Sequence, residues 1–155
     1  MSKVIDFTET KTRTKATDFT EGEAMISVMA NMIEEDKSYW MVGGGPPRTA
    51  VLLAQKLYTP EVTTALEDGV IAPQSVVPSD PMMGFVSAKS SYRAVSWTRM
   101  NNICSHASVG FYDYGVLATL QTDPYGNINS SFLGGDYYHP KRRFGGAGGA
   151  NEIAS

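Results

Sequence analysis

The stretch YWMVGGGPPRTAVLLAQKLYTPEVTTALEDG, residues 39–69, decides the fold. Its first four residues are a short β-prone run that stops at a cluster of glycines and prolines, and helical spacing resumes from Thr49 to Tyr58. Thr59-Pro60 ends that helix, and Val62 to Leu66 has the pattern of a second strand. The order strand, helix, strand predicts an α/β fold with an open, mostly parallel sheet and flanking helices.

The C-terminal end of the second predicted strand is followed directly by Glu67, Asp68 and Gly69. In open α/β sheets the reacting groups gather outside the carboxyl ends of the strands, so Gly43 and Glu67 are expected at the same edge. A carboxylate held there and partly desolvated can act as a nucleophile or a base. A surface glutamate in a turn is the alternative, and position in the sequence leaves both interpretations open.

Two glycine clusters could offer backbone N–H groups to an anion. Gly43, Gly44 and Gly45 match neither the dinucleotide fingerprint nor the P-loop, and a tight turn before a helix explains them equally well. The second cluster, residues 145–149, precedes Asn151 and Glu152, which resemble the start of a helix and so favour an oxyanion site. A flexible loop that binds nothing is the alternative for this second cluster.

The segments before the deciding stretch predict an arm and one helix. Residues 1–18 are polar and are expected to form an N-terminal arm, followed by the main domain over 19–155. Thr20 and Glu23 form a capping box, which predicts a helix start. The stripe that should face the core consists of Ala24, Met25, Val28, Met29, Met32 and Ile33.

Later segments are less regular. Residues 72–91 predict a long loop that could cover a site, and Tyr92 to Asn102 is expected to be helical. A hairpin is predicted between Val116–Gln121 and Ile128–Ser131, because turn residues separate two short strand-like runs. From Gly134 onward the chain is expected to be a glycine-rich loop.

The composition excludes several classes of protein. The chain has 155 residues, 42% of them hydrophobic, and a formal net charge of −3, which fits one folded domain and argues against a nucleic-acid partner. No apolar run is long enough to span a bilayer, so no membrane association is expected. Cys104 is the single cysteine, which favours a cytoplasmic location and a packing role. His106 and His139 lack metal-ligand spacing, so no metal is expected.

Five segments carry a resemblance to a known family. Gly43-Gly44-Gly45-Pro46 matches a G-x-G-x-P loop, and Glu67-Asp68-Gly69 matches an E-N/S-G motif. Asp123 to Asn127, reading DPYGN, leads to Gly146 to Ala150, which matches a G-x-G-G-A/F loop. Asp136 to Phe144 reads DYYHPKRRF, close to D-Y-H-H-P-K-x-R-F. Over most of its length the sequence resembles the β subunits of family I CoA-transferases, of the glutaconate CoA-transferase type.

The resemblance implies a NagB/RpiA/CoA-transferase-like fold and a role for each motif. Glu67 would be the catalytic glutamate, which forms an acyl anhydride with the donor and then a glutamyl-CoA thioester. Gly69 would adjoin the CoA thiol end, and residues 43–45 would form a binding loop. Gly146, Gly148, Gly149 and Ala150 would belong to the loop that supplies the oxyanion hole. Coenzyme A would enter as an acyl-CoA substrate, with no permanently bound cofactor.

The sequence departs from the family pattern in two ways. Asp68 replaces the usual Asn or Ser and places a second negative charge beside the nucleophile, which opposes its ionisation. Family members continue well beyond the second glycine cluster, so the chain resembles the N-terminal portion of a β subunit and its sheet is expected to be incomplete alone. An α-type subunit and a further chain with the missing portion are the implied partners.

Two other functions remain open at this stage. Relatives of these transferases hydrolyse CoA esters, including C–C bonds of cyclic ketone acyl-CoA substrates, and Asp68 could assist such a reaction. The chain could instead be a non-catalytic scaffold subunit, in which the glycine loops serve packing alone. Arg48 and the basic residues 141–143 could attract CoA phosphates, although a solvated or partner-facing patch is an equal alternative.

Overall fold

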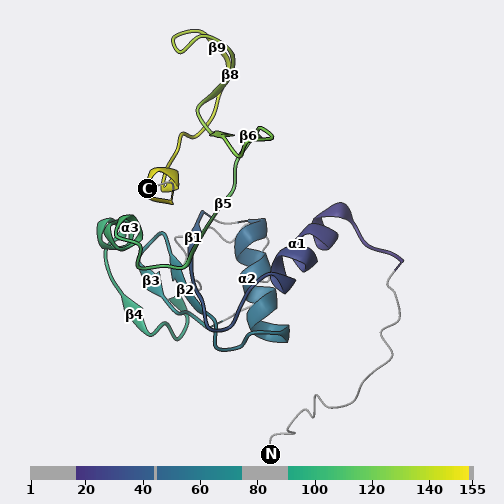
Figure 1. Ribbon diagram of the computed structural model, residues 1–155, viewed down its shortest axis with the longest axis vertical. Coiled ribbons are helices and arrows are strands. Elements are labelled where there is room, and N and C mark those ends of the chain that lie inside the picture. The colour runs from purple at the N-terminus through teal and green to yellow at the C-terminus, as the bar shows by residue number, and fades with distance from the viewer. Residues whose placement is uncertain (1–16, 44, 75–90, 154–155) are drawn as a thin grey trace, which may run out of the picture.

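The computed structural model describes residues 17–43, 45–74 and 91–153. Its centre is a five-stranded sheet in the order β4-β3-β2-β1-β5 (Figure 1). The strands are β1 (Ser38–Val42), β2 (Thr63–Leu66), β3 (Val70–Ile71), β4 (Ser96–Trp97) and β5 (Tyr114–Leu117). β1 runs parallel to both β2 and β5, whereas β3 and β4 pair antiparallel at one side. The predicted α/β class with a mostly parallel sheet is confirmed.

The unit β1-α2-β2 matches the strand, helix, strand order expected for residues 39–69. Helix α2 (Pro46–Leu57) begins with two prolines at its first positions, where a missing N–H is tolerated. Val51 of this helix packs with Tyr39, Met41 and Leu66 in one buried cluster. Burial of side chains of this size contributes about 1.5–3 kcal/mol each, and this packing fixes α2 on its face of the sheet.

Helix α1 (Glu21–Asn31) begins at the predicted capping box, in which Glu23 N–H donates to Thr20 Oγ1 and Thr20 N–H donates to the Glu23 carboxylate. It packs on α2, where the small side chains of Ala50 and Ala54 admit the buried Ala30. The prediction that the whole apolar stripe is core was wrong, because Met25, Val28 and Met32 are exposed. Since α1 lies beside α2 at the outer edge of the molecule, only one flank of the stripe is covered (Figure 1).

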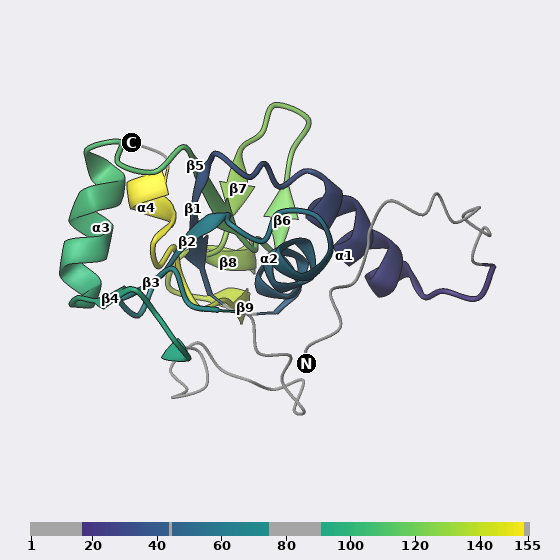
Figure 2. The ribbon, with the colours of Figure 1, turned by 90° about the horizontal axis from the view of Figure 1, so that it is seen from below.

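Helix α3 (Met100–Ser108) covers the opposite face of the sheet from α2 (Figure 2). Its buried Ile103 packs against Trp40 and Ala65. The prediction of a helix over residues 92–102 was wrong, because that segment contains β4 and the helix begins at Met100. The backbone N–H of Thr98 donates to Gly69 O at 2.8 Å, and this pairing holds the segment in an extended conformation beside β3.

Two hairpins form an arm that projects from the sheet (Figure 1). The first joins β6 (Gln121–Thr122) to β7 (Ile128–Asn129), and the second joins β8 (Phe132–Gly135) to β9 (Pro140–Arg143). After the arm the chain returns to the sheet as the short helix α4 (Ala150–Ile153), which contacts α3 and β5. The arm therefore brings the second glycine cluster back toward the parallel strands.

The predicted hairpin is present, but its first strand begins later in the chain than predicted. Residues 114–117 pair with β1 as β5, and only residues 121–122 pair across the turn. Asp123 closes that turn, because its Oδ1 accepts the backbone N–H groups of Tyr125 and Asn127 at 2.9 Å each. The expectation of a continuous loop from Gly134 onward was also wrong, because residues 134–135 belong to β8 and residues 140–143 to β9. Most of the predicted arm 1–18 and of the loop 72–91 lies outside the described residues.

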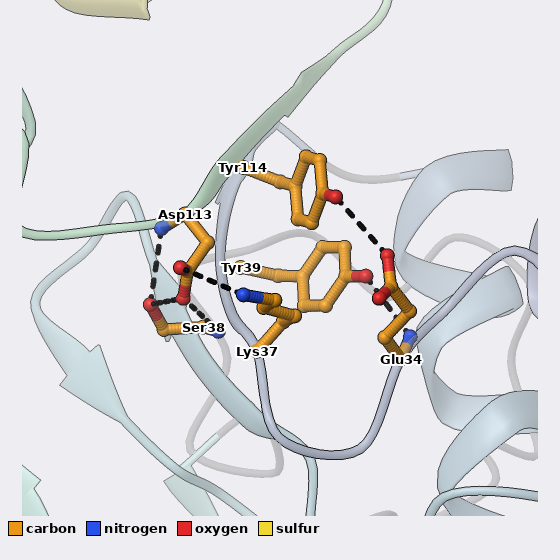
Figure 3. Close-up of polar contacts among 6 residues, drawn as sticks. All are labelled: Glu34, Lys37, Ser38, Tyr39, Asp113 and Tyr114. Carbon is orange, nitrogen blue, oxygen red and sulfur yellow. Dashed lines mark hydrogen bonds and ion pairs between the residues drawn. The ribbon is translucent and has the colours of Figure 1, made fainter.

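A polar network ties the starts of β1 and β5 together (Figure 3). Asp113 Oδ2 accepts hydrogen bonds from Ser38 N–H and Ser38 Oγ, each at 2.8 Å, and Lys37 Nζ lies 3.6 Å from Asp113 Oδ1. Next to it, the rings of Tyr39 and Tyr114 stack with centroids 5.1 Å apart. These contacts lie at the strand ends opposite the candidate site, so their role is to fix β5 in register.

Replacing Asp113 with asparagine should change how stability depends on pH. The hydrogen bonds from Ser38 lower the pKa of Asp113 below its ordinary value of 3.8. A lowered folded-state pKa contributes stability that is present above the ordinary value and is lost as pH falls through the folded value. In urea unfolding, Asp113→Asn should therefore be less stable than wild type near neutrality, and the difference should shrink below about pH 4. The exposed Asp18→Asn serves as control, and a difference that is constant with pH would contradict the assignment.

Candidate functional site

The carboxyl ends of β1 and β2 bring Gly43 and Glu67 together. The backbone N–H of Gly43 donates to Glu67 Oε2 at 3.0 Å. The backbone N–H of Glu67 in turn donates to Met41 O at 3.1 Å, which continues the pairing of the two parallel strands. Because its backbone N–H and its carboxylate are both hydrogen-bonded to the C-terminal end of β1 and the residue that follows, the half-buried Glu67 side chain has a fixed position at the edge of the sheet.

The second glycine cluster lies on the other side of the same carboxylate. An ideal Cβ on Gly148 would lie 3.9 Å from Glu67 Oε1, and one on Gly149 would lie 3.0 Å from the Trp40 ring. Ala150, which begins α4, is buried. One carboxylate oxygen therefore meets Gly43 and the other faces Gly148, although these glycines are far apart in the sequence.

Gly69 has a structural explanation independent of any ligand. Its φ is +100°, and an ideal Cβ would lie only 2.0 Å from the backbone oxygen of Thr98. Its N–H donates to Leu66 O at 3.0 Å and closes the turn between β2 and β3. The close pairing of β3 and β4 therefore requires glycine at this position.

The other predicted glycines lie further from the carboxylate or are not described. Gly146 donates its N–H to Ser130 O at 2.9 Å, so this donor is used at the base of the arm. Gly45 caps α2 with φ +73°, and no atom lies within 4 Å of its ideal Cβ. Gly44 lies outside the described residues. The structure thus brings Gly43, Gly148 and Gly149 to the site and assigns Gly146 to the arm.

Two charged residues flank the elements that hold the carboxylate. Asp68 follows Glu67 directly, and the buried guanidinium of Arg48 lies in the first turn of α2. Burial lowers the pKa of Arg48, and the charge of Asp68 opposes that effect. Sequence reasoning offered phosphate attraction or a solvated patch for Arg48. The structure instead buries it, and no spacing rule in the sequence indicates that.

Sequence reasoning gave Cys104 only a packing role and Glu152 only a place at a helix start, and it assigned neither side chain to this site. Burial raises the pKa of the Cys104 thiol, and the charges of Glu152 and Glu67 raise it further. A raised pKa keeps the thiol protonated, so Cys104 is suited to packing on α3 and not to nucleophilic attack. Glu152 could have been suspected, because it lies only three residues after Gly149, the last glycine of the second cluster.

Other polar candidates lie away from the carboxylate. Residues 141–143 belong to β9 in the projecting arm, where His139 Nδ1 lies 3.5 Å from Asp136 Oδ1 at an exposed position. In the part of the chain that the structure describes, no group of three or more His, Cys, Asp or Glu could hold a metal ion. Within the same ranges, no helix is long and apolar enough to cross a membrane.

Fold and site together define an α/β protein that holds one carboxylate between two glycine loops at the carboxyl edge of parallel strands. No family model matches the sequence. The B subunit of glutaconate CoA-transferase from Acidaminococcus fermentans is 30% identical over 145 residues, which cover 90% of this chain and 52% of that protein. The B subunit of 3-oxoadipate CoA-transferase from Pseudomonas knackmussii is 33% identical over 132 residues, which cover 84% of this chain and 49% of that protein.

Solved structures with the same fold also match this chain. The crystal structure of glutaconate coenzyme A-transferase from A. fermentans matches with a TM-score of 0.75 at 26% identity, over 90% of this chain and 54% of that one. The decarboxylase AibA/AibB matches with a TM-score of 0.73 over 88% of this chain and 56% of that one, but at 19% identity this likeness shows the fold alone. The chain is a homologue of the CoA-transferase B subunits, and it spans about half the length of the curated relatives it matches.

Proposed function

We propose that the chain is the glutamate-bearing part of a heteromeric CoA-transferase that moves CoA between carboxylic acids. The observation that carries this proposal is the half-buried Glu67 carboxylate, which is tied to Gly43 on one side and faces Gly148 on the other. The homology to CoA-transferase B subunits supports the same reaction class. Coenzyme A would enter and leave as substrate and product, with no cofactor retained between turnovers.

The reaction would proceed through two covalent states on Glu67. A carboxylate oxygen of Glu67 attacks the thioester carbonyl of the donor acyl-CoA, and the C–S bond then breaks, so that CoA leaves as a thiolate and a mixed anhydride of the acyl group with Glu67 remains. The thiolate then attacks the glutamyl carbonyl and releases the donor acid as a carboxylate, which leaves a glutamyl-CoA thioester. The acceptor carboxylate reverses these two steps, takes the CoA and restores the free Glu67 carboxylate.

The two glycine loops would have different roles around Glu67. Gly43 N–H orients the carboxylate through Oε2, so the side chain need not be ordered when the substrate binds. Among the described residues, the N–H groups of Gly148 and Gly149 donate to no other group, whereas Ala150 N–H donates to Ala147 O at 3.0 Å. We therefore assign the oxyanion that forms at the thioester carbonyl to Gly148 and Gly149.

Partners would complete the enzyme. An α-type subunit is proposed because the matched relatives are B subunits. The exposed side chains of Tyr125, Tyr137 and Tyr138 on the arm offer apolar contact area for such partners. The division at residue 18 and the cytoplasmic location stay predictions.

A methyl group next to Glu67 should slow the reaction. Gly148→Ala would place its Cβ 3.9 Å from Glu67 Oε1, in the space that the thioester carbonyl must enter. We expect kcat/KM of the assembled complex to fall by about 10²-fold or more. Gly146→Ala is the matched control, because its φ of +99° is also unfavourable for alanine but no atom lies within 4 Å of the new methyl. Equal losses in both variants would contradict the assignment of Gly148.

The acceptor dependence of turnover separates the candidate functions. The assembled complex, given an acyl-CoA and a panel of carboxylic acids, should form a new acyl-CoA at a rate that saturates with one acceptor. Release of free CoA at a rate independent of any acid would indicate a CoA-ester hydrolase instead. Turnover that is unchanged when Glu67 is replaced would indicate a scaffold subunit.

A further inference from the structure

An apolar groove lies along the open edge of the sheet. It has a volume of about 380 Å³ and is bounded by α1, α2 and β5, which is the last strand of the sheet in the described residues. Met29 and Met32 line one side of the groove, and Tyr114 and Val116 line the other. Met32 is 70% exposed, so this apolar surface faces solvent in the single chain. Proteins usually cover an open sheet edge, so we expect the groove to receive another segment.

The rim of the groove is acidic. Glu34 lines the groove and is held there, because its Oε1 accepts the Tyr114 hydroxyl at 3.0 Å (Figure 3). Residues 17–36, which include α1, contain no lysine or arginine, and Lys37 pairs with Asp113. The same range carries six carboxylates, which belong to Asp18, Glu21, Glu23, Glu34, Glu35 and Asp36. An apolar floor with an acidic rim fits a segment that carries both an aromatic ring and positive charge.

The tip of the projecting arm presents such a ring. Tyr138, in the turn between β8 and β9, is 82% exposed. Its ring is perpendicular to that of Tyr137, with the centroids 5.3 Å apart. Tyr137 in turn lies 6.4 Å from the Phe132 ring, and the guanidinium carbon of Arg143 lies 5.1 Å above the Tyr137 ring. These contacts hold the tip in one arrangement, which reduces the entropy lost when Tyr138 binds a partner surface.

Strand β9 places positive charge beside these rings. Lys141 and Arg142 are exposed, and neither forms an ion pair with any of the described residues. The carboxylates of Asp123 and Asp136 accept backbone N–H groups within their own turns of the arm. Residues 132–143 contain three basic residues and one acidic residue, so the β8–β9 hairpin has an excess of positive charge to offer an acidic surface.

The arm does not cover the groove of its own chain. It leaves the C-terminal end of β5 and projects away from the sheet, whereas the groove lies beside β5 itself (Figure 1). Within the described ranges, β6 pairs with β7 alone and β8 with β9 alone. Two-stranded hairpins are marginally stable in water, so the arm and the groove both require a covering surface from outside the chain.

We propose that two copies of this chain exchange arms, so that Tyr138 and the β8–β9 hairpin of each copy pack in the groove of the other. The basic hairpin and the acidic groove belong to one chain, so a second copy supplies both missing surfaces. A two-fold pair uses each arm and each groove once and closes the assembly. The inference goes beyond the proposed function, because the contact uses no residue of the candidate site.

Capture of one tagged copy by another tests the exchange. Two full-length copies with different tags are co-expressed, and purification on one tag should retain the other copy, which native mass spectrometry counts per particle. Tyr138→Ser on both copies removes the ring, and Met32→Lys on both copies places a positive charge in the groove. Each change should reduce the retained copy by about tenfold or more. Tyr125→Ser and Val109→Lys are matched controls, because both residues are exposed and lie outside the contact.

A mixed pair separates arm exchange from any other contact between copies. One copy with Tyr138→Ser keeps its groove and the other with Met32→Lys keeps its arm, so one of the two contacts is restored. This pair should retain more of the second copy than either variant paired with itself. A mixed pair that shows no such gain, a wild type that retains no second copy, or variants that retain as much as wild type would overturn the inference. Loss of an α-type subunit in place of the second copy in Tyr138→Ser would assign the arm to that subunit and overturn it as well.

Discussion

Glu67→Gln should abolish CoA transfer while leaving the assembly intact. The amide keeps the shape of the side chain and an oxygen that can accept the Gly43 N–H, but it cannot form the anhydride. Because loss of a covalent nucleophile removes the whole catalysed path, we expect kcat to fall by about 10⁴-fold or more. Steady-state transfer assays on the purified complex measure this loss.

Glu61→Gln is the control for this experiment. Glu61 is an exposed glutamate near the start of β2, at the opposite end of the strand from Glu67. Its replacement should leave transfer unchanged. Retention of more than a few per cent of wild-type activity in Glu67→Gln, in a preparation free of wild-type enzyme, would mean that another group attacks the thioester.

Gly69→Ala should be among the most destabilising single substitutions in the chain. Its φ of +100° is unfavourable for alanine, and the new Cβ would meet Thr98 O at 2.0 Å. The Thr98 carbonyl cannot move away easily, because the backbone N–H of Thr98 donates to Gly69 O at 2.8 Å. We expect a loss of about 3 kcal/mol or more in the free energy of unfolding, seen as a lower urea midpoint.

Gly126→Ala separates the clash from the backbone conformation. Gly126 has a similar φ of +87°, but no atom lies within 4 Å of its ideal Cβ. This variant should cost about 1 kcal/mol, which is the effect of the left-handed conformation alone. Equal effects of the two substitutions would show that β3 and β4 do not approach as closely as described.

Much of the fold follows from local patterns in the sequence. The β1-α2-β2 unit was predictable, because apolar strands, a glycine-proline break and a helical repeat each specify one state of the chain. The capping box of α1 was predictable for the same reason. Which residues of the α1 apolar stripe are buried and which are exposed was not predictable. Burial depends on how far a neighbouring helix extends, and the sequence of α1 does not contain that information.

The candidate site was predictable in part. Parallel strands place their carboxyl ends together, so the proximity of Gly43 and Glu67 follows from topology. The position of Gly148 follows instead from the path of the arm, whose short strands were partly taken for a loop. The burial of Arg48 is a tertiary property as well, because a basic residue in the first turn of a helix is usually solvated.

The most direct test is to trap the covalent enzyme–CoA species. The assembled complex is mixed with an acyl-CoA in the absence of acceptor and analysed by intact mass, with and without borohydride or hydroxylamine. The account predicts a CoA adduct on this chain that these reagents discharge and that peptide mapping assigns to Glu67. A complex that turns over acyl-CoA but never carries the adduct, or carries it on another residue, would contradict it.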